Sequence, residues 1–346
     1  GRLGGVILFA RNVESPAQLA ALTQQLQAAA KYPLLISIDQ EGGTVARLRH
    51  GFAQSPGAMA LSSIAHDAEA VTEAVSKILG AEMAASGINW TYAPVVDISY
   101  NADNPTVGTR SFGADQEQVA VLAAASVRGF QAGGVAACAK HFPGLGNTAI
   151  DTHLALPRLT TSVEHLLEID LLPYRVTLAS DLATIMTTHT IFTALDADHP
   201  ATLSEHIIAR LIRRELGFEG VVTSDCMEMK AIDDHYTTGE TVSRAANAGL
   251  DILLFAHTPQ KQKDAYDELL AAVQRGDVAE DTVNAANTRI DALKARFSPG
   301  TPDPARIGTD EHIATTRAAA RAGVSLLHQE HDLFTLRESD HARAVF

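Results

Sequence analysis

Short runs of apolar residues alternate along the chain with longer stretches in which apolar residues recur every three or four positions. The short runs predict buried strands, and the longer stretches predict amphipathic helices. Seven strands are expected in this way, at residues 4–9, 34–39, 89–97, 134–139, 183–188, 221–225 and 251–255. Helices are expected at residues 15–30, 67–85, 115–131 and 163–180, after Ser204, and in two stretches that end near Phe297.

The order of these elements predicts an α/β fold. Strands that are apolar along their whole length and alternate with helices are typical of a parallel sheet covered by helices. The seven strands are one fewer than a (β/α)8 barrel contains. Because the chain opens on Gly1 and almost directly on a strand, a missing N-terminal segment would account for the shortfall.

A run rich in proline and glycine, residues 298–304, predicts a linker after the last of these helices. A further helix is expected beyond it, followed by an apolar run at residues 323–327 that is a candidate strand. We therefore expect residues 1–297 to form the main domain, and residues 298–346 to form a linker and a C-terminal extension.

Composition narrows the classes of partner. The chain has 346 residues and a formal net charge of −14, without a cluster of Lys and Arg. This charge argues against nucleic acid or an anionic membrane as the main partner, and no apolar run approaches the length of a membrane span. The two cysteines, Cys138 and Cys226, favour a reducing compartment. We therefore expect a cytoplasmic protein, although a chain that opens on Gly1 makes the absence of a visible signal peptide uninformative.

Polar side chains end most of the expected strands. These strand-end residues are Asp39, Asp97, Lys140 with His141, His189 and Asp225. The carboxyl ends of parallel strands meet at one mouth of a barrel, where active sites lie. Gathering polar groups there costs desolvation free energy unless the groups have a use. The mouth is therefore the expected functional site, and the sequence leaves open whether Asp97 and His189 act there or only support it.

The stretch from Lys140 to His153, KHFPGLGNTAIDTH, carries the densest set of chemically useful residues. The proline and two glycines that follow His141 predict a loop directly after the strand. That loop delivers Asp151 and His153, one residue apart. The spacing lets a carboxylate orient an imidazole for general acid/base catalysis.

This stretch resembles the signature of family 3 glycoside hydrolases, in the branch of the NagZ-type β-N-acetylglucosaminidases. The family's pattern is KHFPGHG, a short spacer and then Asp, Ser or Thr, and His; Leu145 here replaces the second histidine. Three further stretches resemble family motifs: IDQEGGTVARL at residues 38–48, NPTVGTRSF at 104–112 and TSDCMEMKAI at 223–232. Two positions depart from them, since Thr44 stands where Arg is common and Cys226 stands where a second Asp is common.

The resemblance implies a (β/α)8 TIM-type barrel over residues 1–297, with residues 298–346 as the start of a truncated second domain. Asp225 would be the nucleophile that forms a covalent glycosyl-enzyme intermediate. No second carboxylic acid in the motifs is a clear acid/base, so His153, oriented by Asp151, is the expected proton donor and acceptor. The residues that would bind the hydroxyl or acetamido groups of the sugar are Asp39, Arg47, Arg110, Lys140 and His141.

The expected activity is that of a retaining exo-β-N-acetylglucosaminidase. Its substrate would be a carbohydrate, a β-linked N-acetylglucosaminide such as a cell-wall fragment released during peptidoglycan recycling. No cofactor and no metal are expected, and the oligomeric state is left open.

Other hypotheses remain open at this point. One is a β-N-acetylglucosaminide phosphorylase, because a neutral histidine would repel phosphate less than a carboxylate would. A second is a β-glucosidase of the same family. A third is a metal-dependent barrel hydrolase, whose possible ligands are His141, His153, His189, Asp225 and Lys140. The non-enzyme alternative is a sugar-binding barrel, but binding alone needs neither Asp225 nor the pair of Asp151 and His153.

Overall fold

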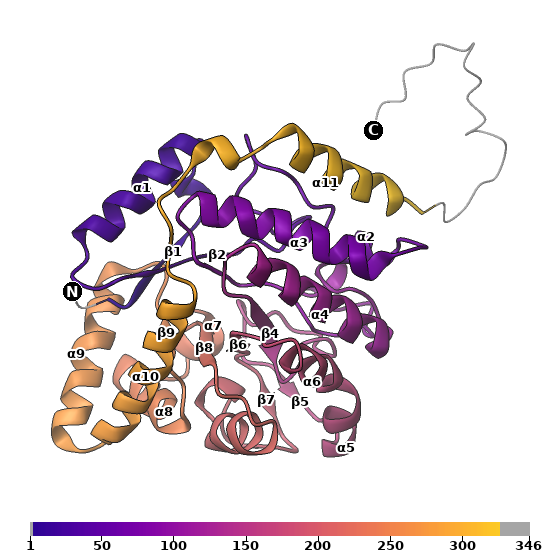
Figure 1. Ribbon diagram of the computed structural model, residues 1–346. Helices are drawn as coiled ribbons and strands as arrows, with labels where there is room; N and C mark the ends of the chain where they lie inside the picture. The colour runs from indigo at the N-terminus through magenta and orange to yellow at the C-terminus, as the bar shows by residue number, and fades with distance from the viewer. Residues whose placement is uncertain (1–2, 326–346) are drawn as a thin grey trace, which may run out of the picture.

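The computed structural model describes residues 3–325, and its centre is a set of parallel strands surrounded by helices (Figure 1). The central strands are β1 (Gly5–Leu8), β2 (Leu35–Ile38), β3 (Trp90–Thr91), β4 (Cys138–Phe142), β6 (Thr184–Thr187), β8 (Val221–Cys226) and β9 (Ile252–Leu254). They pair in the orders β1–β2–β3 and β4–β6–β8–β9, and single bridges from Trp90 to Ala136 and from Val95 to Lys140 join the two groups. All these pairings are parallel, so the expected TIM-type α/β barrel is confirmed.

Helices connect successive strands and cover the outside of the barrel (Figure 1). The longer ones are α1 (Pro16–Ala29), α3 (Ala68–Ala85), α4 (Gln116–Ala132), α8 (Thr238–Ala248), α9 (Pro259–Arg275), α10 (Glu280–Arg296) and α11 (Asp310–Ala322). The shorter ones are α2 (Ala58–Ser62), α5 (Val163–His165), α6 (Leu172–Leu178) and α7 (Lys230–Asp233), with π-helical segments at Leu166–Asp170 and His206–Glu215. Two short strands, β5 (Arg158–Leu159) and β7 (Ile191–Phe192), pair with each other in a separate sheet.

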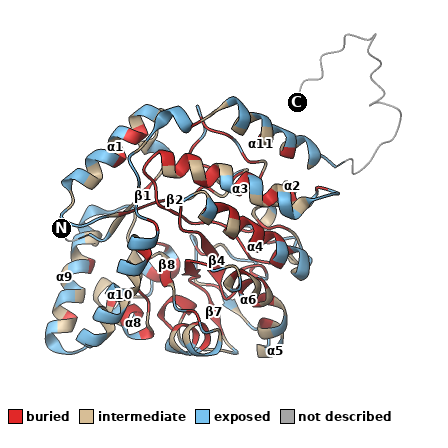
Figure 2. Cartoon of the chain, viewed as in Figure 1, coloured by how far each residue is buried: buried red, intermediate tan, exposed pale blue. Residues whose placement is uncertain are grey.

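Burial follows the apolar pattern of the sequence (Figure 2). All four residues of β2 and all five of β4 are buried, as expected for strands covered on both faces. Helix α4 begins where the Asp115 side chain accepts a hydrogen bond from the N–H of Gln118, and it buries a face that includes Val119 and Phe130. The core is therefore the barrel interior together with the layer between the strands and the helices.

Helix α8 and strand β3 differ from the expectation. Helix α8 was not expected, although Thr237 and Glu240 form a capping box that marks its start. The strand expected over residues 89–97 is regular only over Trp90–Thr91. Pro94 follows, and a proline has no N–H to donate to a neighbouring strand. The chain nevertheless continues along β4 as far as the bridge from Val95 to Lys140.

The helix expected after Ser204 is π-helical over His206–Glu215, and it still buries Ile208, Leu211 and Ile212. At the other end of the chain, Gly323 ends α11, and residues 323–325 form no strand. The rest of the candidate strand at 323–327 lies outside the described residues.

The barrel has an open seam between β1 and β9. Within residues 3–325 these two strands do not pair with each other. A cavity of about 360 Å3 lies there, lined by apolar side chains that include Val6, Ile7, Ile252 and Leu254. A further N-terminal strand, suggested by the sequence, remains a prediction.

Candidate active site

Residues from distant parts of the chain meet at the carboxyl ends of the central strands. Asp39 follows β2, Lys140 and His141 lie in β4, and Asp225 lies in β8. Although 101 residues separate Asp39 from Lys140, the Lys140 ammonium lies 2.9 Å from Asp39 Oδ1. Only 3% of the Lys140 side chain is exposed, so this ion pair belongs to the interior of the mouth.

Glu41 stands at the centre of this ion-pair cluster, and it is a residue that the sequence-based site omitted. Its Oε1 lies 2.6 Å from Lys140 Nζ, and its carboxylate accepts hydrogen bonds from Arg110 Nε and Nη2 at 2.8 and 2.7 Å. Burial acts to raise the pKa of Glu41, but Lys140 and Arg110 outweigh it and lower the pKa to about 2. The sequence did contain a signal for Glu41, because it lies in the same motif as Asp39, two residues further on.

The two arginines expected to bind sugar differ in how far they are already engaged. Arg110 pairs with Glu41 and also donates to the carbonyl of Thr106 at 3.0 Å, which leaves two of its five N–H bonds for a ligand. Arg47 lies 3.7 Å from Asp39 through Nη2, and its buried Nε has no hydrogen-bond partner among the described residues. Arg47 is therefore the freer donor of the two.

Asp225 is the second-last residue of β8, and its Oδ1 accepts a hydrogen bond of 2.7 Å from the N–H of Cys226, the last one. Burial acts to raise the pKa of Asp225, but His141, the Cys226 N–H and Lys140 outweigh it and lower the pKa. Asp225 is therefore an ionised carboxylate at neutral pH, the form that a nucleophile needs.

His189, whose role the sequence left open, is fully buried beside the turn that follows Asp225. Its Nε2 lies 3.0 Å from the carbonyl oxygen of Cys226, and its Nδ1 lies 2.9 Å from the Thr202 hydroxyl. A carbonyl can only accept, so Nε2 carries the proton. Burial lowers the pKa of His189, which keeps the ring neutral and makes it a support for the Asp225 turn.

His141 and Asp97 form a buried pair. His141 Nδ1 lies 2.7 Å from Asp97 Oδ2, and the side chain of Asp97 is fully buried. The second oxygen of Asp97 accepts a hydrogen bond of 2.7 Å from the N–H of Leu145. His141 thus lies in the cluster where a sugar ligand was expected, with a carboxylate behind it.

Asp151 and His153 form the expected pair on the loop after β4. Asp151 Oδ1 lies 2.8 Å from His153 Nδ1 and also accepts the His153 N–H at 2.9 Å. The His153 side chain is 68% exposed, and its Nε2 makes no hydrogen bond within the described residues. The carboxylate and the imidazole have the relation that acid/base catalysis needs. The neighbouring Thr152 is buried, and its carbonyl accepts a hydrogen bond of 3.4 Å from the N–H of Ala231, so this part of the loop packs on the segment that follows β8.

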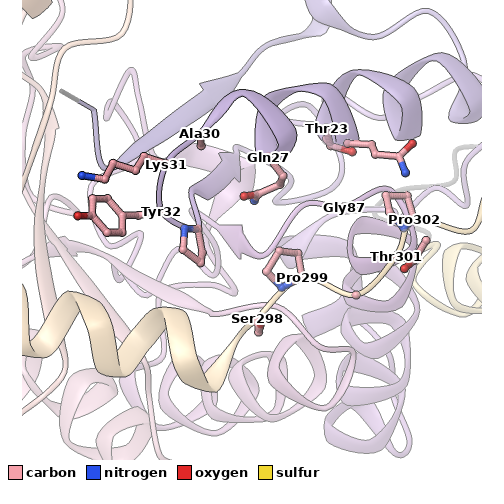
Figure 3. A pocket seen from close by; sticks show the side chains of 13 residues that line it. Thr23, Gln27, Ala30, Lys31, Tyr32, Gly87, Ser298, Pro299, Thr301 and Pro302 are labelled. Carbon is pink, nitrogen blue, oxygen red and sulfur yellow. The ribbon is translucent and has the colours of Figure 1, made fainter. Parts of the chain in front are cut away.

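Other parts of the described chain offer no competing site of this kind. Within residues 3–325, no three His, Cys, Asp or Glu side chains are grouped closely enough to hold a metal ion. A cavity of about 440 Å3 lies at the opposite end of the barrel, between the end of α1 and residues 298–302 (Figure 3), and no candidate site residue lines it. None of the helices described could cross a bilayer, since none is both long and apolar enough.

The fold and this mouth define the chain as an α/β barrel with a carboxylate and a histidine-bearing loop at the carboxyl ends of its strands. The profile of the glycosyl hydrolase family 3 N terminal domain matches residues 1–293. The chain therefore belongs to glycosyl hydrolase family 3.

Curated relatives are similar along most of this chain. Beta-hexosaminidase A of Pseudoalteromonas piscicida is 34% identical over 320 residues, which cover 85% of this chain and 54% of that protein. A beta-hexosaminidase of Alkalilimnicola ehrlichii is 39% identical over 263 residues, which cover 75% of each chain. The chain thus spans about half the length of the first of these relatives.

A solved structure is similar over nearly the whole chain. The glycoside hydrolase family 3 beta-N-acetylglucosaminidase of Paenibacillus sp. str. FPU-7 has a TM-score of 0.90 and 42% identity, over 95% of this chain and 64% of that one. The beta-N-acetylglucosaminidase of Thermotoga maritima has a TM-score of 0.78 and 32% identity, over 88% of this chain and 64% of that one.

Proposed function

We propose that this chain is the catalytic barrel of a retaining exo-β-N-acetylglucosaminidase. Its substrate is a β-linked N-acetylglucosaminide such as a peptidoglycan fragment. The names of the relatives support the sugar, and the ionised Asp225 beside the buried cations supports the reaction. The observation that carries the proposal is the position of Asp225 at the carboxyl end of β8, in the mouth that also holds Lys140 and His141. The lowered pKa of Asp225 agrees with it.

In the first step, Asp225 attacks the anomeric carbon while the bond to the leaving oxygen breaks. His153 gives its proton to that oxygen, and Asp151 stabilises the imidazolium before the transfer. The product is a glycosyl ester of Asp225. In the second step, the neutral His153 takes a proton from water, and the oxygen of that water displaces Asp225 from the anomeric carbon. Two inversions retain the anomeric configuration.

The sugar is held by the residues around Asp225. Lys140 and Arg47 donate to its hydroxyl oxygens, and Asp39 accepts from its hydroxyl groups. Arg110 gives its two remaining N–H bonds, while His141 contacts the ring from the side of β4. His153 reaches the leaving oxygen when its loop closes over the bound sugar, since loop closure commonly completes such a site.

We also propose a cellular compartment for this activity. The two cysteines, Cys138 and Cys226, are both free, as expected in a reducing compartment. We place the enzyme in the cytoplasm, where it would act on cell-wall fragments that the cell recycles.

The experiment is a turnover assay with an aryl β-N-acetylglucosaminide, in phosphate and in phosphate-free buffer, with NMR of the first anomer formed. Hydrolysis that gives the β anomer in both buffers supports the proposal. Sugar 1-phosphate formed only in phosphate would establish the phosphorylase instead.

A fluorinated N-acetylglucosaminide that traps the intermediate should label Asp225. The Asp225→Asn variant should lose the label and about 10³-fold or more of the turnover. Label on another carboxylate would refute the assignment.

A further inference from the structure

Asp97 contacts two parts of the mouth through its two carboxylate oxygens. One is the ring of His141, and the other is the base of the loop that carries His153. Its Oδ2 lies 2.7 Å from His141 Nδ1, and its Oδ1 lies 2.7 Å from the N–H of Leu145. The backbone N–H of His141 is shared between the two oxygens at 3.2 Å each. The side chain of Asp97 is fully buried, so these contacts are made without competition from water.

The first of these contacts fixes where His141 carries its proton. An ionised carboxylate can only accept a hydrogen bond, so Nδ1 of His141 must be protonated. Nε2 makes no hydrogen bond within the described chain, and 6% of the side chain remains exposed. The ring belongs to the same mouth as Asp225, since His141 lies in β4 and Asp225 lies at the carboxyl end of β8. Nε2 is therefore the ring nitrogen of His141 that is available to bind a sugar.

The second contact fixes the base of the loop that carries Asp151 and His153. Gly146 packs so closely on the backbone of Ile98 that a Cβ there would lie only 1.7 Å from the Ile98 oxygen. Asn104 Nδ2 donates to the carbonyls of Leu145 and Gly146 at 2.8 and 3.1 Å. The base of the loop is thus fastened to the segment that begins with Asp97, whereas the His153 side chain further along is exposed.

We propose that Asp97 is a positioning residue that sets both halves of the site at once. It holds His141 with the proton on Nδ1 and Nε2 free for the sugar, and it holds the loop base at Leu145 at the place from which His153 can reach the leaving oxygen. The consequence for catalysis rests on the proposed function, whereas the state of the His141 ring and the anchoring of Leu145 do not.

Asp97→Asn tests this because an amide has one accepting atom and one donating group. If the amide oxygen faces the Leu145 N–H, then the NH2 group faces His141 Nδ1, which must give up its proton to become an acceptor. If the amide is turned round, two donors meet at Leu145 and the loop base loosens. Each arrangement disturbs one of the two contacts, and each has its own signal.

The measurements are ring 15N NMR of His141, assigned by comparison with His141→Gln, and hydrogen exchange of the Leu145 amide. In the wild type we expect a protonated Nδ1 and a slowly exchanging amide. In Asp97→Asn we expect either the Nε2–H tautomer or exchange that is faster by about tenfold or more. If the tautomer changes, turnover should fall by about 10²-fold on good and poor leaving groups alike, as expected when a sugar is misplaced. If the loop base loosens, the loss should be larger on poor leaving groups, which need the proton from His153.

Asn104→Asp is the matched control. It keeps the oxygen that accepts from the N–H groups of Thr106 and Val107 but removes the donor to Leu145 and Gly146. The amide of Leu145 should then exchange faster while the His141 ring keeps its Nδ1 proton.

A folded Asp97→Asn protein with both signals unchanged would overturn the proposal. A wild-type His141 whose Nδ1 carries no proton would also overturn it. This ring 15N measurement on the wild type can be made even if Asp97→Asn does not fold. If the wild type has no glycosidase activity, the proposed function fails while the ring and exchange data still decide the role of Asp97.

Discussion

At the scale of single residues, the mouth is a network in which most charges already have partners. Lys140 has three N–H bonds and uses two of them on Asp39 and Glu41, which leaves one for a ligand. Glu41 accepts from Lys140 and from Arg110 and is almost completely buried. Each cation therefore offers a donor in a fixed direction, as a sugar with several hydroxyl groups requires.

Glu41 should make the stability of the protein depend on acid pH. Its pKa falls from 4.5 to about 2 on folding, which corresponds to about 3 kcal/mol. Because the folded pKa is the lower one, this stabilisation is complete above the unfolded pKa of about 4.5 and is lost as the pH falls toward 2. Glu41→Gln removes the titrating group. The difference in free energy of unfolding between wild type and variant, measured in urea, should therefore narrow as the pH falls through this range. Parallel pH curves for the two proteins would contradict the assignment.

His153 should matter only where the leaving group needs a proton. His153→Ala is expected to lose about 10²–10⁴-fold in kcat on an alkyl or sugar aglycone. It should lose much less on a dinitrophenyl glycoside, whose leaving oxygen departs without protonation. The measurement is kcat for the two substrates with wild type and variant. Equal losses on both would mean that His153 positions the sugar and that another residue is the acid.

At the scale of elements, apolar runs located the central strands because burial on both faces leaves them without polar positions. The same pattern missed α8, whose start is marked only by the pair Thr237 and Glu240. It also could not foresee that β3 would be two residues long, since the break depends on Pro94 within an apolar run. Periodicity therefore located buried elements, and local hydrogen-bonding chemistry set their ends.

The site was foreseeable to a similar extent. Strand-end positions identified Asp39, Lys140 and Asp225, which the fold brings to one mouth. The partner of Arg110 was not foreseeable from spacing, because Glu41 lies 69 residues away along the chain. Contacts between residues so far apart are set by how the strands pair, and sequence spacing does not encode that pairing.

Gly146 should be the most sensitive position in the loop after β4. A Cβ there would lie 1.7 Å from the Ile98 oxygen, so Gly146→Ala must displace the backbone. We expect a loss of about 1–3 kcal/mol or more in the free energy of unfolding, together with lower turnover. Gly300→Ala is the control, because nothing lies within 4 Å of a Cβ at that position. The measurement is the melting temperature of the two variants. Equal values would mean that the backbone at Gly146 can shift to accept a Cβ at little cost in stability.

At the scale of the whole molecule, the segment after the expected boundary at residue 297 packs on the barrel. Helix α11 runs along α3 and α2 (Figure 1). The N–H of Asp303 donates to the carbonyl of Ala85 at 2.8 Å. That boundary remains a prediction, but residues 303–322 are part of the same packed unit as α3.

Glu82 of α3 contacts α11, so substitutions at Glu82 should measure how strongly α11 packs on the barrel. It is 1% exposed, and its carboxylate accepts from the N–H groups of Ala53 and Gly308 and from His312 Nδ1, at 2.9, 2.8 and 2.8 Å. Because a buried carboxylate depends on its donors, Glu82→Gln and His312→Ala should be coupled by about 1–3 kcal/mol in a double-mutant cycle of unfolding free energies.

The control for this cycle lies on the same helix. Glu73 is 42% exposed and pairs with Arg128, so Glu73→Gln should cost at most about 1 kcal/mol. Its effect should be the same with or without His312→Ala, since the two residues share no partner. If Glu82→Gln behaved in the same additive way, the contact between Glu82 and His312 would contribute nothing to the packing of α11 on the barrel. Strong coupling would instead include α11 in this unit, because the buried charge of α3 would then depend on a donor from that helix.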